Sequence, residues 1–349
     1  MEFLPTVWFV LIAVLWLGYL FLEGFDLGVG MLIKWFSRDE RERRLLLNTI
    51  GPVWDGNEVW LLTAGGATFA AFPFWYASLF SALYLPLTLT LLALIFRAIS
   101  IEYRGKGHSD RWRSFWTWAM ALGSGVAAFC VGAMLALTST GMPLDANGDN
   151  IGGPFAWLTV PAVIGGLGVL GFTWLHGLLF VALKTDGPVR ERARRAAGRW
   201  APFLLVPLVA WVVWVQVATG TWWGWAIILL AAASMVLMWV WISRGAEKRA
   251  FLAQAGFLVL GVVSIFTNMY PVVLPSTLDP AFSLTVDTAS SSGYTLGVML
   301  AVAIVFVPIV LGYQIWSYRV FARRLRVEHI PEAHVVPVAI RGHAGARTH

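Results

Sequence analysis

Residues 5–33, PTVWFVLIAVLWLGYLFLEGFDLGVGMLI, form a long apolar run that contains two charged residues, Glu23 and Asp26, and the basic stretch 34–44, KWFSRDERERR, follows directly. A helix needs about 20 mostly apolar residues to cross the hydrocarbon core of a bilayer. The run is therefore long enough for a transmembrane helix. The basic block at its end indicates which side of the membrane that end faces.

The composition of the whole chain extends this interpretation. Of 349 residues, 58% are hydrophobic and 13% are charged, against roughly 45–50% and 25% in soluble globular domains. A water-soluble surface cannot be built from this composition, and the 14% of aromatic residues argues against a disordered chain. A single cysteine, Cys130, excludes an intrachain disulfide.

Nine apolar segments predict an all-α integral membrane protein. We place these segments at residues 5–33, 52–72, 76–100, 114–138, 157–183, 200–219, 221–243, 251–273 and 294–321. Two of the joints are very short, at Pro73 and Gly220.

The basic residues lie almost entirely in alternate connections. All 25 Lys and Arg except Arg97 fall in stretches 34–44, 104–113, 184–199, 244–249 and 319–347. Cytoplasmic loops carry the excess of Lys and Arg, so we expect the N-terminus outside and the C-terminus in the cytoplasm. The net charge of +6 thus records orientation and indicates no nucleic-acid partner. Residues 39–50, charged and then apolar, are expected to lie along the cytoplasmic interface.

Four carboxylates lie within or beside the first two spans, as the pairs Glu23 with Asp26 and Asp55 with Glu58. Each pair has i, i+3 spacing and therefore shares one helix face. Asp55 follows Pro52, the expected first helical position, so a favourable helix dipole is an alternative explanation for that pair. A carboxylate well inside the membrane must be neutral, paired or hydrated. Arg97, in the third span, is the expected partner, and together these residues indicate a hydrated cavity open to the cytoplasm.

Other patterns favour structural roles. His176 is the one histidine inside a predicted span, so a bis-histidine haem is not expected, and the irregularly spaced tail histidines predict no metal site. The GxGxxG match at residues 166–171 lies inside a span and indicates close helix packing, as do Gly24 and Gly28. Residues 145–156 imitate a calcium loop but lack its glycine and its final glutamate.

Several motifs resemble the N-terminal signature of subunit II of the cytochrome bd quinol oxidases. They are EGFDLGVG at 23–30, GPVWDGNEVWL at 51–61 and AFP at 71–73. Residues 269–278 and DTASS at 287–291 are similar to the last outer loop of that family. The resemblance covers about residues 5–325.

The resemblance implies an enzyme complex in the bacterial cytoplasmic (inner) membrane. A partner, subunit I, carries haems b558, b595 and d and oxidises a membrane quinol, either ubiquinol or menaquinol, while O₂ is reduced to water. This chain is then expected to hold no catalytic residue and to ligate no haem. Some family members hold a structural quinone in this subunit, and the resemblance leaves open whether this chain does, or whether a small accessory subunit is present.

The resemblance also implies a domain plan of two four-helix bundles and one peripheral helix. The first bundle spans 1–138, including the interfacial segment 39–50, the second spans 139–273, and the outer loop with the ninth helix spans 274–326. Residues 327–349 lie outside the resemblance, have no apolar period and are expected to form a flexible cytoplasmic tail.

Carried over position by position, Asp26, Trp54 and Asp55 match residues of a polar proton route in that family. Glu23 matches a position that also holds Asp, and Glu58 one that also holds Gln. Our hypothesis is a cytoplasmic proton pathway with Arg97 and Glu102 at its mouth, formed by Glu23, Asp26, Trp54, Asp55, Glu58, Arg97 and Glu102. Two alternatives are a proton-coupled secondary transporter and a subunit that only stabilises its partner.

Overall fold

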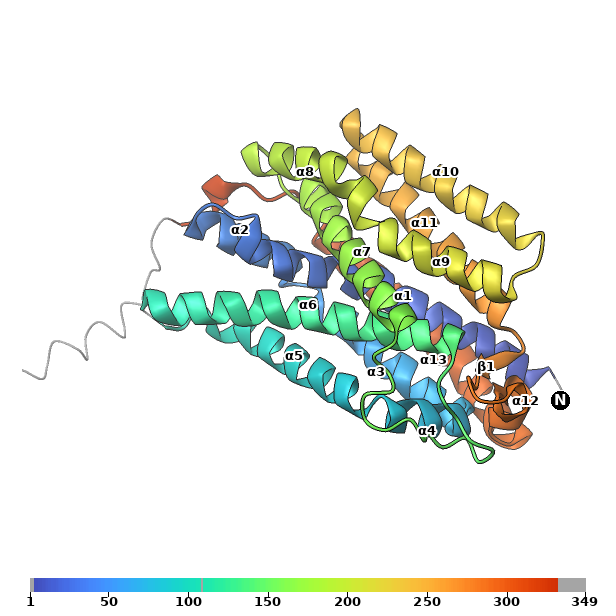
Figure 1. The fold of residues 1–349 in the computed structure, drawn as a ribbon. Helices are drawn as coiled ribbons and strands as arrows, with labels where there is room; N and C mark the ends of the chain where they lie inside the picture. The colour runs from blue at the N-terminus through green and yellow to red at the C-terminus, as the bar shows by residue number, and fades with distance from the viewer. Residues whose placement is uncertain (1–2, 108, 332–349) are drawn as a thin grey trace, which may run out of the picture.

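The computed structural model describes residues 3–107 and 109–331, and they are mainly helical (Figure 1). The longer helices run side by side along one axis, with α1 in the middle of the assembly. His108 and residues 332–349, which make up most of the predicted tail and include His334, His343 and His349, lie outside the described residues.

The helices are α1 (Leu4–Trp35), α2 (Glu40–Ile50), α3 (Trp54–Ala71), α4 (Pro73–Ala82), α5 (Tyr84–Tyr103), α6 (Asp110–Thr140), α7 (Val160–Lys184), α8 (Pro188–Leu204), α9 (Val206–Thr219), α10 (Gly224–Ser243), α11 (Glu247–Met269), α12 (Val286–Ala289) and α13 (Gly293–Val320). Two short strands, β1 (Val272–Leu274) and β2 (Leu284–Thr285), pair antiparallel in the loop after α11. Two single turns are η1 (Pro280–Phe282) and η2 (Val327–His329).

Eight stretches of the described residues are long and apolar enough to cross a membrane, α8 and α9 counting as one. They confirm a multi-pass helical membrane protein. The predicted segment 52–72 forms α3, which is not among the eight. Its first turns carry Asp55, Asn57 and Glu58, so its polarity sets it apart from the other spans.

Two predicted boundaries are wrong for reasons of local chemistry. The segment 76–100 is broken at Leu83 into α4 and α5. Pro86 has no amide hydrogen to donate to the carbonyl of Ala82, which interrupts the helix there. Pro52 does not begin α3, because residues 51–53 form a turn and the helix begins at Trp54. Residues 40–50 of the segment predicted to lie along the interface form a helix, α2, and the Asp39 side chain accepts from the Glu42 amide at its start.

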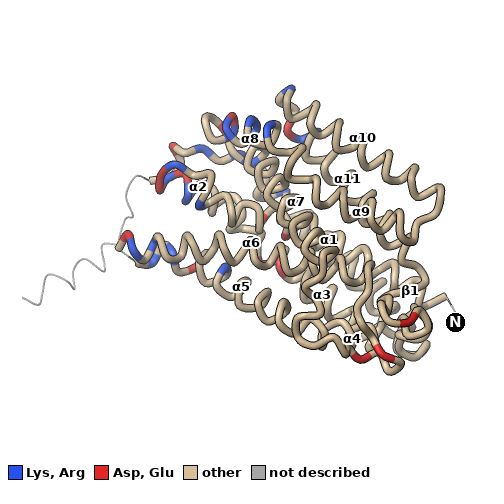
Figure 2. Tube along the Cα trace, in the orientation of Figure 1, with Lys and Arg blue, Asp and Glu red and all other residues tan. Residues whose placement is uncertain are grey.

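The charged residues separate the two ends of the molecule (Figure 2). Lys and Arg gather at the end where α2 and α8 lie, whereas the end that carries the N-terminal label shows only acidic residues. Such a separation of Lys and Arg to one end is expected of a membrane protein whose orientation is set by its basic loops.

The core is densest around the second half of α1. Every residue from Glu23 to Ile33 is buried, because α3, α6 and α7 all pack on this helix. A helix that is buried on all sides needs no polar face. The backbones of α1 and α7 come very close at Gly28 and Gly177, which confirms the predicted close packing for Gly28, whereas Gly24 makes only ordinary contacts.

The connections tie the ends of the helices together. On the N-terminal side, the Met142 amide donates to the Pro275 carbonyl at 3.0 Å, so the α6–α7 loop pairs with the β1–β2 loop. On the basic side, residues 323–331 run along the helix ends. Leu325 exchanges backbone hydrogen bonds with Lys184 and Asp186 at 2.8 and 2.9 Å.

The α1–α7 contact predicts a sharp difference between two neighbouring glycines. A Cβ atom at Gly28 would lie 2.0 Å from the Thr173 carbonyl oxygen, whereas one at Gly24 would have its nearest neighbour at 3.5 Å. Gly28→Ala is therefore expected to lower the free energy of unfolding by about 1–3 kcal/mol. Gly24→Ala is the matched control. Thermal unfolding of the purified complex measures both, and equal midpoints for the two variants would contradict this packing.

Candidate functional site

A cluster of charged and polar side chains lies inside the helix bundle. We call Glu23, Asp26, Asn57, Glu58 and Arg97 the buried charge cluster. They come from α1, α3 and α5, which the fold brings together, and all but Glu58 are fully buried. The side chain of Glu58 is 20% exposed.

Arg97 is the centre of the cluster. Its Nη1 lies 2.7 Å from Glu23 Oε1 and 3.7 Å from Glu58 Oε2, and all of its side chain is buried. The expected pairing of Arg97 with the helix-one carboxylates is thus confirmed for Glu23. One guanidinium thus serves two carboxylates, and Asp26 is a third carboxylate buried in the same cluster.

Asn57 connects the cluster to the last helix. Its Nδ2 donates to Asp26 Oδ2 at 2.6 Å, and its Oδ1 accepts from Tyr318 Oη at 2.7 Å and from Gln314 Nε2 at 3.2 Å. Gln314 in turn accepts from the Trp60 indole at 3.0 Å. Asp26 is therefore held in place by an amide rather than by the arginine.

Several polar atoms of this region have no hydrogen-bond partner among the described residues. They include Glu23 Oε2, Asp26 Oδ1, Arg97 Nε and the Tyr19 hydroxyl. Buried polar groups in native proteins are nearly always satisfied by protein or by ordered water. The arrangement of donors and acceptors thus suits water molecules that can exchange protons with the carboxylates.

The other predicted site residues take different positions. Trp54 is buried, with its ring centroid 6.0 Å from the Arg97 guanidinium carbon. Asp55, in the first turn of α3, and Glu102, near the end of α5, are exposed. The expectation that Arg97 lies at a mouth is wrong, because the side chain is fully buried between three helices.

Four polar residues of this region are not among the predicted site residues: Tyr19, Asn57, Gln314 and Tyr318. Their side chains are uncharged, so the cost of an intramembrane charge, which singles out the carboxylates and Arg97, does not identify them. Gln314 and Tyr318 stand four residues apart in a long apolar helix and so share one face. That spacing was the available signal.

His176 forms part of the core. Its Nε2 donates to the Phe21 carbonyl at 2.9 Å, and its ring stacks on Phe251 and Phe172 at centroid distances of 4.7 and 5.1 Å. Among the described residues no group of three His, Cys, Asp or Glu could hold a metal ion. The imidazole is fixed by a backbone carbonyl and two aromatic rings.

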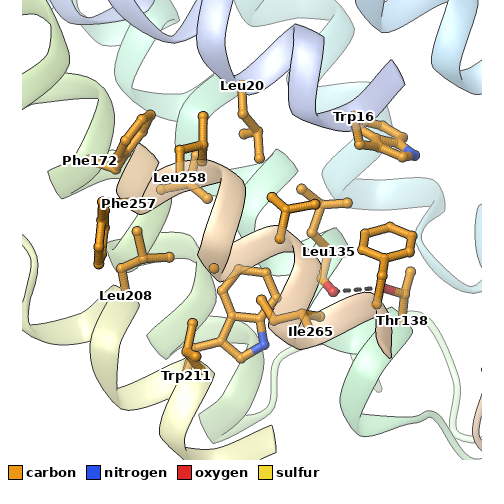
Figure 3. Close-up of a pocket in the computed structure, with 15 residues that line it drawn as sticks. Trp16, Leu20, Leu135, Thr138, Phe172, Leu208, Trp211, Phe257, Leu258 and Ile265 are labelled. Atoms are coloured by element: carbon orange, nitrogen blue, oxygen red, sulfur yellow. Dashed lines mark hydrogen bonds between the residues drawn. The ribbon is translucent and has the colours of Figure 1, made fainter. Parts of the chain in front are cut away.

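An apolar cavity of about 40 Å³ lies between α1, α6, α7, α9 and α11 (Figure 3). Trp16, Phe172, Trp211 and Phe257 are among its lining residues, and the Trp211 indole is turned to the Ser139 hydroxyl at 3.0 Å. It offers no ionisable group.

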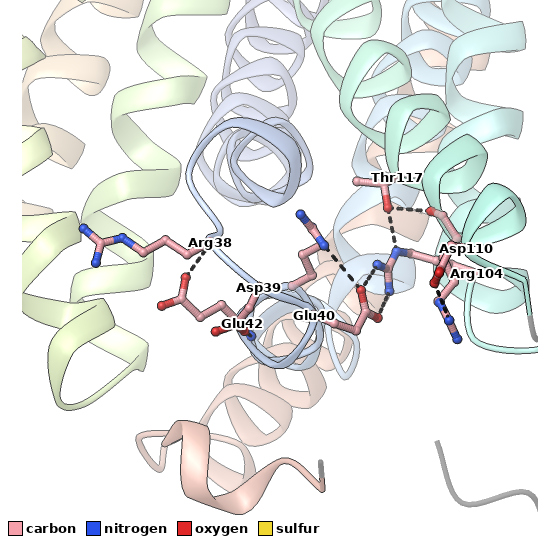
Figure 4. A network of polar contacts seen from close by, with 9 residues as sticks. Arg38, Asp39, Glu40, Glu42, Arg104, Asp110 and Thr117 are labelled. Carbon is pink, nitrogen blue, oxygen red and sulfur yellow. Dashed lines mark hydrogen bonds and ion pairs between the residues drawn. The ribbon is translucent and has the colours of Figure 1, made fainter. Parts of the chain in front are cut away.

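A second polar network anchors α2 on the basic side of the molecule (Figure 4). Arg104, which is buried, donates two hydrogen bonds to Glu40, at 2.8 and 2.6 Å, and one to Thr117. Glu42 accepts in the same bidentate way from Arg192. Burial acts to raise the pKa of Glu40, but the hydrogen bonds and charge of Arg104 outweigh it and hold that pKa below its ordinary value.

The sequence and the fold both match one family. The sequence model described as cytochrome bd terminal oxidase subunit II matches residues 4–321. The chain is 38% identical over 330 residues to the Bacillus subtilis protein named cytochrome bd ubiquinol oxidase subunit 2, covering 93% of this chain and 98% of the relative. It is 32% identical over 367 residues to cytochrome bd-I ubiquinol oxidase subunit 2 of Escherichia coli, covering 94% and 97%.

A solved structure has the same fold. It is the bd oxidase from Geobacillus thermodenitrificans, with a TM-score of 0.77 and 16% sequence identity, covering 92% of this chain and 99% of the matched chain. At this identity the likeness concerns the fold alone.

The Glu40–Arg104 contact predicts a pH-dependent stability. Glu40→Gln leaves the buried Arg104 without its carboxylate and is expected to lower the free energy of unfolding by about 2 kcal/mol at pH 7. Because the folded-state pKa of Glu40 is lowered, this contribution is complete above its ordinary pKa of about 4.3 and disappears as the pH falls through the lower folded value.

The control is Asp110→Asn, a neighbouring carboxylate whose side chain is 96% exposed. Thermal unfolding of the purified complex between pH 7 and pH 3 measures the effect. A Glu40→Gln midpoint equal to that of the control at pH 7 would contradict the anchoring role.

Proposed function

The chain belongs to the family of cytochrome bd terminal oxidase subunit II, and from this premise we propose that its buried charge cluster carries protons for oxygen reduction. The resemblance seen in its motifs is thereby confirmed. The chain is a subunit of a quinol-oxidising terminal oxidase, a multi-pass membrane protein that works in a complex with subunit I. The secondary-transporter alternative has no support from the matched relatives.

We propose further that the chain lies in the bacterial cytoplasmic membrane with its N-terminus outside and its C-terminus inside. Nine crossings follow if α3 also spans the membrane. In that arrangement α1, α3, α4–α5 and α6 form one four-helix bundle, α7, α8–α9, α10 and α11 form the other, and α13 is peripheral. The gathering of Lys and Arg at one end supports this orientation (Figure 2).

The redox chemistry is proposed to reside in subunit I, with haems b558, b595 and d and the site for ubiquinol or menaquinol. When bound there, the haems supply electrons to O₂, and each O₂ reduced to water consumes four protons. The part of this chain that the structure describes supports this division, because its one intramembrane histidine, His176, is engaged by Phe21 and packed between two rings. This chain is left with the proton supply.

The observation that carries the proposal is the contact of Arg97 with carboxylates from two other helices, Glu23 and Glu58. A membrane protein rarely buries ionisable residues unless they work in transport or in a proton relay. A single guanidinium lowers the cost of an ionised carboxylate in the cluster, while the remaining carboxylic acids hold exchangeable protons.

The geometry suggests an order of residues. Asp55 lies in the first turn of α3, at the basic end of the molecule, and Glu58 follows one turn further in. Glu58 is partly exposed and faces Arg97, so it joins the surface of the subunit to the cluster. The Asn57 amide donates a hydrogen bond to Asp26 Oδ2. A proton bound by the Asp26 carboxyl group is therefore held at Oδ1.

Asp55 and Glu58 also indicate where subunit I docks. An ionisable side chain on the surface of a membrane helix must be covered by protein or by water rather than by lipid. The face of α3 that carries these two residues is therefore proposed to meet the partner, and the proton route ends at that interface.

A purely structural subunit is the remaining alternative, since the Arg97 contacts would also hold α1, α3 and α5 together. The two functions differ in what a neutral, isosteric substitution does. A structural carboxylate affects assembly and stability, whereas a relay residue affects turnover in a complex that assembles normally.

Asp26→Asn tests the proposal directly. The change keeps the size of the side chain and an oxygen for Asn57 but removes the exchangeable proton, so quinol-driven O₂ consumption is expected to fall by about tenfold or more. The reduced-minus-oxidised optical spectrum should keep its haem bands.

Asp149→Asn, an exposed carboxylate in the α6–α7 loop, is the control and should keep full turnover. Asp55→Asn is measured beside it. Full turnover in both Asp26→Asn and Asp55→Asn would disprove the proton pathway. Loss of the haem bands together with the activity would assign the carboxylates to assembly.

A further inference from the structure

A second, larger pocket lies at the basic end of the molecule, apart from the buried charge cluster. It has a volume of about 490 Å³ and is enclosed by α1, α7, α11, the end of α2 and the end of α13. Its wall is almost entirely apolar and rich in aromatic rings, from Phe21, Phe25, Phe180, Phe251 and Phe321. Such a wall suits an acyl chain better than water or an ion.

The rim of the pocket is positively charged. Lys184 at the end of α7, Lys248 in the first turn of α11 and Arg324 after α13 all line it. Lys248 is exposed and forms no ion pair with any carboxylate among the described residues. Three cations from three different elements thus converge on the opening of one apolar pocket.

The acidic residues nearby do not cancel this charge. Arg324 Nη2 lies 3.7 Å from Glu247 Oε2, but Arg190 holds the same carboxylate at 2.8 Å. Asp186 is likewise shared, with Arg190 and Arg326 at 3.7 and 2.7 Å. Two carboxylates therefore face three arginines, and the two lysines of the rim remain in excess.

The backbone fixes the rim in place. Leu325 bonds to the carbonyl of Lys184 and to the amide of Asp186, which holds the segment after α13 against the end of α7. The Lys184 ammonium donates to the carbonyls of Phe321 and Arg323. An ammonium has three hydrogens, so one remains to be directed at a ligand.

We propose that this pocket binds one phospholipid with an anionic headgroup from the cytoplasmic leaflet. Its phosphate lies between Lys184, Lys248 and Arg324, and an acyl chain lies among the phenylalanine rings. Basic pockets between membrane helices on the cytoplasmic side are the places where anionic headgroups bind. The positive rim disfavours a proton or a metal cation. A free phosphate could bind at the rim but would leave the apolar cavity unfilled.

The test uses the complete two-subunit complex in bilayers of phosphatidylcholine mixed with phosphatidylglycerol. After detergent wash, native mass spectrometry counts the phospholipid retained, and about one phosphatidylglycerol per complex is expected. Lys248→Gln with Arg324→Gln should reduce retention by roughly fivefold for each charge removed. Lys106→Gln, an exposed lysine outside the pocket, is the matched control and should retain the lipid.

A second variant separates the pocket from its charges. Ala322→Trp fills the cavity from its exposed wall and leaves every cation in place, so it should also lose the lipid. Excess inorganic phosphate should not displace the lipid, because phosphate has no acyl chain.

Five outcomes would overturn the proposal. Four are equal retention of phosphatidylcholine, full retention by the double variant, full retention by Ala322→Trp, and displacement by phosphate alone. The fifth is a retained quinone that responds to Ala322→Trp but not to the loss of charge. None of these readouts depends on oxidase activity.

Discussion

The fold of this subunit depends on one buried cation. Arg97 lies fully inside a membrane bundle, where an unpaired charge costs several kcal/mol, and it is tolerated because Glu23 reaches it at 2.7 Å. The carboxylate and the guanidinium come from α1 and α5, and Glu58 adds α3. These three helices must therefore bring Glu23, Glu58 and Arg97 to one depth in the membrane, and this requirement fixes how far each helix is shifted along its axis relative to the others. The same contacts bring protonatable side chains close together.

The last helix is joined to this centre by neutral hydrogen bonds. Most residues of α13 are exposed, and Leu296 is its one buried residue. One polar link to the bundle runs through Gln314 and Tyr318 to Asn57, and from Asn57 to Asp26. The Asn57 amide therefore contacts both the last helix and the Asp26 carboxylate.

Much of this architecture was predictable because membrane solvation imposes strong rules on sequence. Apolar length identified the spans, basic loops identified one end, and the cost of intramembrane charge singled out Glu23, Asp26 and Arg97. The helix is interrupted at Leu83 because Pro86 has no amide hydrogen to donate to the carbonyl of Ala82. A hydropathy pattern does not register this missing donor. Asn57 and Tyr318 lie 261 residues apart, and neutral side chains carry no charge signal, so their contact needed the folded structure. The burial of Arg97 depends on how α5 rotates against its neighbours.

The structure offers Asp26 two approaches from the basic end of the molecule. One runs along α3, where Asp55 and Glu58 present exchangeable protons and the surface is polar. The other is the aromatic pocket, whose inner wall includes Tyr318, the residue that bonds to Asn57. If the proposed lipid occupies that pocket, its acyl chain shields Tyr318 from water, and the positive rim opposes the entry of protons. The approach along α3, past Asp55 and Glu58, then remains for the proposed proton route toward subunit I.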